Sequence, residues 1–447
     1  MIRGEVSVPK ILTSLISIGA LSSGLLAAPV EGLLEKAIQA ERWIDSVKIV
    51  TDEGLAWPID PAQPQVATNL YSGTPGIVLF YLELYRATGA PAYLETAKQG
   101  ARYLIHHLPT SNEEFGAGLY TGVGGVGFTL IETARLTGDF ELWQGALRIV
   151  QLIEESAKMD AAGAYWNEST DIIGGSAGIA LFLLYAAEQL QELRLLDLAA
   201  SAGRSLMFQA KTAEKGSKWA MSADFPRLMP NFSHGTAGIA YLLAVLYQET
   251  GEKEFLDSAL EGAEYLLSVA NTEGGVCLIF HHEPDGEDLY YLGWCHGPVG
   301  TARLFYKLHQ ITGQPRWETA VKDSAKGILE SGIPDQPTPG FWNNVSQCCG
   351  SAGVTEFFLD LAAEYDDERY ASMAHKMARQ AVAHATATAD GAKWIQAEHR
   401  VQPDLLIAQI GYMQGASGIG MMLLRLDAFQ RGLKRGIRFP DSPFQGK

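Results

Sequence analysis

Three of the four cysteines in this 447-residue chain stand in two short segments rich in small residues. Cys348 and Cys349 are adjacent and precede Gly350-Ser351-Ala352-Gly353, and Cys295 lies in the similar segment Gly293-Trp294-Cys295-His296-Gly297. Thiolates are ligands that zinc accepts readily, and three protein ligands leave a fourth position for water or substrate. We therefore predict a zinc site on Cys295, Cys348 and Cys349. The alternative is three buried free cysteines, because cysteine is among the most buried residue types.

Three thiolates would give the bound zinc a formal charge of −1. A substrate thiol that enters as the fourth ligand would lose its proton to the metal, which leaves an electron-rich thiolate suited to nucleophilic attack. Water activation is the rival use, but neutral ligands polarise water better than three thiolates do. The predicted site therefore favours thiol chemistry. The fourth cysteine, Cys277, lies in an apolar run and is predicted to be a core residue.

The composition excludes several classes of function. The chain is 47% hydrophobic and 19% charged, which is typical of a globular protein with a large core. Its formal net charge of −17 disfavours nucleic acid and anionic membrane surfaces as partners. Four cysteines are too few for a disulfide framework in a chain of this length.

Residues 1–29 form a signal-like or leading segment, and they leave the localisation open. Arg3 and Lys10 precede an uncharged run over residues 11–28, which resembles a secretory signal. Glu5 and the lack of a clean cleavage motif argue against that interpretation. The two alternatives are an exported or membrane-tethered protein and a cytoplasmic protein with a leading helix or a mis-assigned start. No other run is long and apolar enough to span a bilayer.

One pattern recurs seven times along the chain: a polar or small residue, then Gly-x-x-Gly, then a long apolar run. The first glycines are residues 73, 122, 175, 235, 297, 350 and 415. Regular self-similarity of this kind indicates a repeat architecture. The residue before the first glycine varies, and a scaffold alone would not require thiol or imidazole there: it is Ser72, Thr121, Gly174, His234, His296, Cys349 or Gln414.

The repeats predict two kinds of helix. The runs after the motifs, such as residues 77–82 and 179–184, are apolar nearly all round, so we expect these helices to be buried on every side. Several of them end in Thr-Gly, where glycine supplies the left-handed residue that stops a helix. Amphipathic helices follow, as at residues 93–108, 141–153, 255–269 and 317–329, and residues 30–49 provide a leading copy.

Seven buried and seven amphipathic helices predict an all-α fold. The simplest closed arrangement is an α/α toroid of seven inner and seven outer helices, formed as a single domain by residues 30–447. The connections back to each Gly-x-x-Gly motif are long, and loops of that length are usually functional. Because these loops all reach one end of the toroid, we expect the motif turns, the thiols and the loops to share it.

The combined motifs resemble those of the lanthionine synthetase C-like (LanC-like) cyclases. The resemblance covers roughly residues 30–426 and rests on the seven repeats together with Gly293-Trp294-Cys295-His296-Gly297, Cys348-Cys349-Gly350, His234-Gly235, and Asp171 before Gly174-Gly175. It implies an α/α toroid whose central zinc activates peptide cysteines for addition to dehydroalanine or dehydrobutyrine. The products are the thioether rings of lanthipeptide biosynthesis. Eukaryotic relatives bind glutathione and add it to such residues.

The resemblance also implies partners and roles. The expected partner is a dehydrated peptide or a small thiol such as glutathione, and a separate dehydratase must supply the dehydrated residue. Addition to that residue makes an enolate that needs a proton. His234 matches the acid/base position of the family, and His296 is a second candidate. Asp171 would orient a catalytic group or polarise the entering thiol; its alternative role is to cap a helix or pair with a loop.

Two positions depart from the family pattern. The usual third ligand, a histidine, is Cys349 here, as in a thiolate-rich subset of these cyclases. The family arginine four residues before the first zinc cysteine is Tyr291 here. Of the remaining candidates, His281 and His282 are expected to be solvated, whereas three tryptophans near the site could hold a peptide or belong to the core: Trp166, Trp294 and Trp342.

Two other functions stay open from the sequence. One is a non-catalytic zinc-, thiol- or glutathione-binding toroid, which would use the same metal site. The other is a glycan-processing α/α toroid enzyme, which requires a pair of carboxylates around a sugar. Only Asp171 and Glu168 lie near a motif, and no second acid occupies a motif position.

Overall fold

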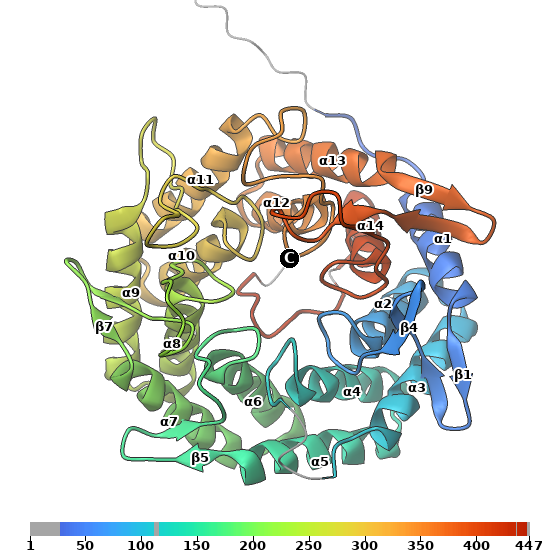
Figure 1. The fold of residues 1–447 in the computed structure, drawn as a ribbon, viewed down its shortest axis with the longest axis horizontal. Helices are drawn as coiled ribbons and strands as arrows, with labels where there is room; N and C mark the ends of the chain where they lie inside the picture. The colour runs from blue at the N-terminus through green and yellow to red at the C-terminus, as the bar shows by residue number, and fades with distance from the viewer. Residues whose placement is uncertain (1–26, 111–115, 435, 445–447) are drawn as a thin grey trace, which may run out of the picture.

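The computed structural model describes residues 27–110, 116–434 and 436–444, so most of the predicted leading segment lies outside the described residues. Fourteen helices in the described residues form two concentric rings around a central axis (Figure 1). This arrangement confirms the predicted all-α toroid of seven inner and seven outer helices. Among the described residues, no helix has the length and apolar character needed to cross a bilayer.

The inner ring consists of seven helices that are each 15 residues long and almost completely buried. Backbone hydrogen bonds join the seven turns that precede these helices, so all seven N-termini lie at one end of the ring, and the equal lengths place the C-termini about 22 Å away at the other. The helices are α2 (Thr74–Thr88), α4 (Val123–Thr137), α6 (Ser176–Leu190), α8 (Thr236–Thr250), α10 (Pro298–Thr312), α12 (Ser351–Tyr365) and α14 (Ala416–Gln430).

The outer ring packs one amphipathic helix against each inner helix. Helix α1 packs on α14, which closes the ring between the two ends of the chain. The predicted leading helix, residues 30–49, was three residues too long at each end, and after its C-terminal end Ile49 begins strand β1. The outer helices are α1 (Leu33–Ser46), α3 (Pro91–His106), α5 (Phe140–Ser156), α7 (Arg194–Phe208), α9 (Lys253–Val269), α11 (Pro315–Glu330) and α13 (Glu368–Ala383).

Short antiparallel two-stranded hairpins occur in the connections, a feature that helical periodicity did not predict. They satisfy backbone groups of the long loops without forming a sheet core. The strands pair as β1 (Ile49–Thr51) with β2 (Gly54–Ala56), β3 (Pro58–Asp60) with β4 (Gln63–Val66), β5 (Lys158–Met159) with β6 (Ala164–Tyr165), β7 (Lys211–Thr212) with β8 (Ser217–Lys218), β9 (Ala385–Thr388) with β10 (Gly391–Trp394), and β11 (Gln396–Ala397) with β12 (Leu406–Ile407).

Glycines start and stop the inner helices for two different reasons. At Gly350, which precedes α12, a side chain would run into the backbone of Asn344, because the incoming loop crosses there. At Gly89, which follows α2, φ is 68°, a left-handed conformation that glycine adopts without steric cost. The predicted Thr-Gly helix stops are therefore confirmed at this end of the ring.

A closed ring of backbone hydrogen bonds joins the seven motif turns. Six of the seven donors and all seven acceptors stand two residues before the first glycine of a repeat, and the N···O distances are 2.8–3.2 Å. This ring fixes which turns are neighbours and how closely their backbones approach. The N–H donors and carbonyl acceptors are Tyr71 to Tyr120, Tyr120 to Ile173, Ile172 to Ser233, Ser233 to Cys295, Cys295 to Cys348, Cys348 to Met413, and Met413 to Tyr71.

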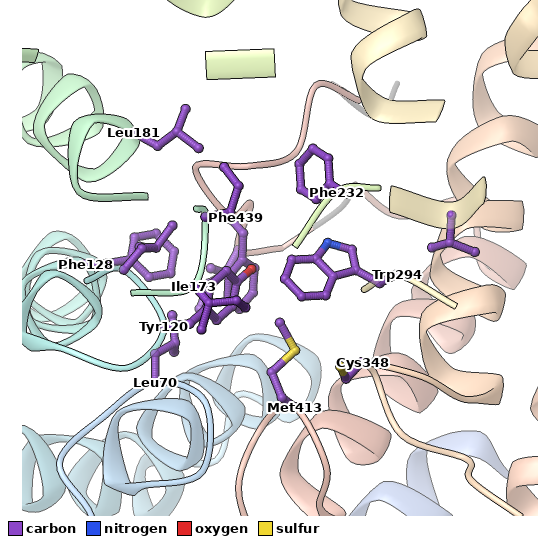
Figure 2. Close-up of a cluster of buried hydrophobic side chains, with 14 of the residues drawn as sticks. Leu70, Tyr120, Phe128, Ile173, Leu181, Phe232, Trp294, Cys348, Met413 and Phe439 are labelled. Carbon is purple, nitrogen blue, oxygen red and sulfur yellow. The ribbon is translucent and has the colours of Figure 1, made fainter. Parts of the chain in front are cut away.

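The interior of the ring is filled by side chains of the turns and by the C-terminal segment, residues 436–444 (Figures 1 and 2). Phe439 stacks on Tyr412 with ring centroids 4.6 Å apart. Asp441 accepts a 2.6 Å hydrogen bond from Arg303 and is fully buried. The toroid is therefore closed through its middle rather than open from end to end.

Candidate metal centre

The backbone ring brings two predicted zinc ligands together although they are 53 positions apart in the sequence. Cys295 and Cys348 are consecutive members of the ring, and the Cys295 N–H donates to the Cys348 carbonyl oxygen at 3.2 Å. Cys349 follows directly. At Gly293 a Cβ atom would lie 2.8 Å from the Cys349 Cα, so the absence of a side chain permits this approach.

The three sulfur atoms form a compact cluster. Both the Cys295–Cys349 and the Cys348–Cys349 Sγ···Sγ distances are 3.3 Å, and all three sulfur atoms lie within 4.8 Å of one another. All three cysteines are buried and free of disulfides. Tetrahedral zinc with Zn–S bonds of ~2.3 Å requires sulfur separations of about 3.8 Å, so the donor set fits the ion after small side-chain adjustments.

Neighbouring hydrogen bonds favour thiolate at one cysteine of the cluster, Cys348, and raise the pKa of Cys295 and Cys349. Hydrogen bonds from the thiols of Cys295 and Cys349 hold the pKa of Cys348 well below its usual range, and the Tyr71 hydroxyl adds to this effect. Tyr71 also accepts a 3.1 Å hydrogen bond from the Gln414 side chain, which orients its ring. A buried thiolate is thus stabilised by donors from three different repeats.

His234 and Asp171 form a hydrogen-bonded pair beside the cluster. The His234 Nδ1 lies 2.6 Å from the Asp171 Oδ2, and the carboxylate is buried. The other oxygen, Oδ1, accepts hydrogen bonds from the backbone N–H groups of Gly174 and Gly175 at 2.9 and 2.8 Å. Asp171 therefore contacts both the turn before α6 and the His234 ring.

Three further histidines lie near the cluster: His281, His282 and His296. His296 is buried, its Nδ1 has no hydrogen-bond partner among the described residues, and burial holds its pKa well below the usual range. The expectation that His281 and His282 are solvated is wrong. His282 is buried, and burial together with the charge of His282 lowers the pKa of His281 to about 3. The long 271–295 loop folds back onto the ring, so its polar sequence did not indicate exposure.

An arginine from a different loop lies beside Tyr291. The Arg400 Nε donates to the Tyr291 hydroxyl at 3.4 Å, and both side chains line the cavity above the cysteines. Burial raises the pKa of Tyr291. Position 291 carries a tyrosine where the family pattern has an arginine. Arg400, in the connection after β11, nevertheless places a guanidinium in the same cavity.

The remaining sequence candidates divide between core and cavity. Trp166 and Trp294 are buried, and Trp294 packs edge-on against Tyr120 (Figure 2). Trp342 lines the cavity, where its indole N–H donates to a backbone carbonyl at 2.9 Å. Cys277 is buried away from the cluster, as predicted, and burial raises its pKa to about 11.

The cavity above the cysteines has a volume of about 250 Å³. Its walls come from the motif turns and from the 281–291 and 398–401 loops. These two loops therefore lie at the same end of the toroid as the motif turns and the thiols, as predicted. Glu398 is the single carboxylate among its lining residues, and it accepts a 2.6 Å hydrogen bond from Gln409. This arrangement does not provide the carboxylate pair that glycan cleavage requires.

Sequence analysis did not name Tyr71 or residues 398–401, which all line the cavity, and it expected His281 to be solvated. A signal for Tyr71 was present, because it stands two residues before the first glycine of its repeat, as Cys295 and Cys348 do in theirs. No comparable signal existed for Arg400, which lies in an irregular connection that only the folded structure places at the cavity.

The ring of paired helices with a thiol cluster at one end defines a toroidal protein with a candidate metal centre. The chain belongs to the lanthionine synthetase C-like protein family, whose family model matches residues 64–433. Nisin cyclase has a similar solved structure, with a TM-score of 0.58 at 16% sequence identity over 90% of this chain and 94% of that chain. The alpha-1,6-mannanase of Salegentibacter sp. HEL1_6 gives a TM-score of 0.47 at 14% identity over 89% of this chain and 99% of that chain.

Proposed function

We propose that this protein is a zinc-dependent cyclase-like enzyme that adds a cysteine thiol to dehydroalanine or dehydrobutyrine in a peptide. The observation that carries the proposal is the cluster of three buried thiols beneath an open cavity, with a histidine–carboxylate pair beside it. Family membership supports the same chemistry. Cys295, Cys348 and Cys349 would hold the metal, and the cavity would receive the substrate thiol.

Bound zinc would lower the pKa of a thiol in its open position and keep the resulting thiolate close to the acceptor. The substrate sulfur then forms a bond to the β-carbon of the dehydro residue, and the double bond shifts toward the carbonyl to give an enolate. The thiol proton leaves to the His234 side chain or to water. The bond-forming step consumes no other reactant.

His234 is the proposed proton donor to the α-carbon. Its Nδ1 is held by the Asp171 carboxylate, which leaves the opposite ring nitrogen, Nε2, to carry the transferred proton. Because the two glycine N–H groups hold Asp171 in turn, the imidazole has one preferred orientation. His296, being neutral and buried, would line the pocket rather than carry charge.

Arg400 is the proposed partner of the enolate oxygen. The Tyr291 hydroxyl accepts its Nε hydrogen, so the other guanidinium N–H groups remain available to the cavity. A fixed cation next to developing negative charge lowers the barrier most where water is excluded. This role would compensate for tyrosine at position 291.

The substrate must arrive already dehydrated, because the cavity provides for addition and not for the loss of water from serine or threonine. We therefore propose a separate dehydratase as the preceding activity. The thiol could belong to the same peptide, which gives a ring, or to a small molecule such as glutathione, which gives an adduct.

The test combines purified protein, a peptide that contains one dehydroalanine, and either an internal cysteine or glutathione. Mass spectrometry and chiral analysis of the thioether should reveal acceleration over the uncatalysed addition and one preferred stereoisomer. Cys349→Ala should abolish the acceleration, whereas Cys277→Ala should not. A protein that binds zinc and thiol but gives the uncatalysed rate and a racemic product would be a binder, and the enzymatic proposal would be wrong.

A further inference from the structure

A second cavity opens at the end of the toroid opposite to the cysteines. It has a volume of about 590 Å³ and is lined by the C-terminal halves of α2, α4, α6, α8 and α10 together with residues 436–442 of the C-terminal segment. The cysteines stand at the N-terminal ends of the inner helices. The C-terminal segment lies between the two cavities, since Phe439 and Ser442 line both this cavity and a small one beside Trp294.

Two cationic side chains at this cavity make few or no hydrogen bonds with described residues. Lys307 is 8% exposed, and its ammonium makes one hydrogen bond, to the Gln248 side-chain oxygen at 3.0 Å. Arg438 is exposed at the cavity and makes no hydrogen bond or ion pair with a described residue. Lys307 and Arg438 both line this cavity, and burial together with the charge of Arg438 lowers the pKa of Lys307 to about 8. Two like charges that line one cavity repel each other, and a bound anion would relieve this repulsion.

The acidic residues of the cavity do not neutralise this pair. Glu132 accepts hydrogen bonds of 2.6 Å from both Arg135 and Tyr185. Glu249 accepts from the Gln248 amide and only partly offsets the charge of Arg438 at Lys307. Glu188 is exposed at the rim.

A serine hydroxyl without a hydrogen-bond partner among the described residues belongs to the same cavity. Ser442 is 6% exposed, and its Oγ has no hydrogen-bond partner among the described residues. Buried polar atoms are almost always satisfied, so we expect a ligand in the cavity that this serine and the two cationic side chains line to supply the missing partner of this hydroxyl. Leu181, Leu184 and Val245 supply apolar lining to the same cavity.

From this arrangement we propose that the cavity is a binding site for a small organic anion. Its carboxylate or phosphate group would lie between Lys307, Arg438 and the Ser442 hydroxyl, and its carbon body would pack on the apolar lining. Because Lys307 belongs to the ring and Arg438 to the C-terminal segment, the ligand would also tie that segment into the pore. The inference does not rest on the proposed enzymatic function.

Isothermal titration of the zinc-loaded full-length protein with phenyl phosphate, benzoate and benzyl alcohol tests the proposal. Binding of at least one of the two anions, but not of the neutral alcohol, is the expected result, and the stronger of the two identifies the anionic group. Lys307→Met and Arg438→Gln should each weaken binding by about tenfold, because each removes a charge-assisted hydrogen bond. Lys215→Met, at an exposed hairpin turn, should bind as the unaltered protein does.

Two results would overturn the proposal: neither anion binds to the unaltered protein, or both cavity variants retain full affinity. Arg438→Gln alters an exposed side chain, so it keeps the test valid even if the buried Lys307 variant does not fold. If the bound anion holds the C-terminal segment in the pore, the anion should slow proteolytic removal of that segment. An unchanged rate of removal would show that the anion does not hold the segment there.

Discussion

The backbone N–H of Cys295 donates to the carbonyl oxygen of Cys348, and this 3.2 Å hydrogen bond places two residues from different repeats side by side. The same contact recurs around all seven turns, so the cysteines meet because the scaffold is closed, not because a local motif gathers them. Cys349 adds the third sulfur from the same turn as Cys348. The candidate metal centre is thus a property of the ring.

Gly293→Ala should weaken zinc binding without abolishing the fold. An added methyl group would lie 2.8 Å from the Cys349 Cα and 2.9 Å from the Cys348 carbonyl oxygen, so the two turns must separate. Overpacking of this kind costs about 1–3 kcal/mol. We expect a lower zinc affinity in a competition assay with a chelator.

Gly116→Ala is the matched control, because its nearest neighbour outside the local chain, the Thr121 carbonyl oxygen, would be 3.8 Å from the new atom. It should bind zinc as the unaltered protein does. Equal zinc affinity in both variants would contradict the account of how the turns approach.

Asp171→Asn should separate the two roles of this carboxylate. The amide oxygen can still accept from Gly174 and Gly175, so melting temperature and zinc content should stay close to normal. The amide nitrogen, however, would face the His234 Nδ1 and reverse its preferred tautomer. We expect about a hundredfold lower kcat in the thioether-forming assay, within the range for loss of acid–base catalysis.

Asp171→Ala should lose both rate and stability, because the two glycine N–H groups would then lack their acceptor. If Asp171→Asn retained full activity, the carboxylate would have only its structural role, and His234 would need no orienting partner.

Arg400→Met should lower kcat more than it raises KM, since the guanidinium is proposed to act on the enolate rather than on the ground state. Arg400→Lys should restore part of the rate. Arg227→Met is the control: this exposed arginine is near His282 but is not among the residues that line the cavity. An effect on KM alone would assign Arg400 to substrate binding instead.

The buried carboxyl group of Glu41 should make the free energy of unfolding depend on pH. Burial and the nearby Asp45 raise its pKa from 4.5 to about 7, so the folded protein holds this proton more tightly than the unfolded chain does. The free energy of unfolding therefore falls as pH rises from about 4.5 to about 7, and the penalty persists above that range. Glu41→Gln removes it and keeps an acceptor for the Tyr81 hydroxyl.

At pH 8 we expect Glu41→Gln to be more stable than the unaltered protein by about 1 kcal/mol, a value that allows for the partial exposure of this side chain. At pH 4.5 the two proteins should be equally stable. Thermal unfolding at the two pH values measures the difference. Glu35→Gln, on the same helix but exposed, should change stability little at either pH. A gain for Glu41→Gln that is the same at both pH values would show that ionisation is not its cause.

The sequence predicts the rings well because the signals for them are local. The wholly apolar run after Gly76 and the stop at Gly89 define α2 without reference to the rest of the chain, and the same holds in the other repeats. The thiols were identifiable because cysteine is rare here and two of the four are adjacent. The excess length predicted for α1 arose because Ile49 continues the apolar pattern while its backbone pairs with Ala56.

The missed features depend on tertiary contacts. Arg400 reaches Tyr291 only because the 387–413 connection folds over the ring, and His281 is half-buried because its own loop packs it against Tyr291 and His296. Asp441 enters the pore to meet Arg303, a contact over 138 positions that no periodicity indicates. Sequence patterns predicted the elements, whereas the walls of the site come from irregular segments.

X-ray absorption at the zinc edge of the purified, metal-loaded protein tests the central claim most directly. The account predicts one zinc per chain with three sulfur neighbours at about 2.3 Å and one lighter ligand, and a loss of one sulfur in Cys349→Ala but not in Cys277→Ala. A zinc environment with fewer than three sulfur atoms, or no zinc after loading, would contradict it.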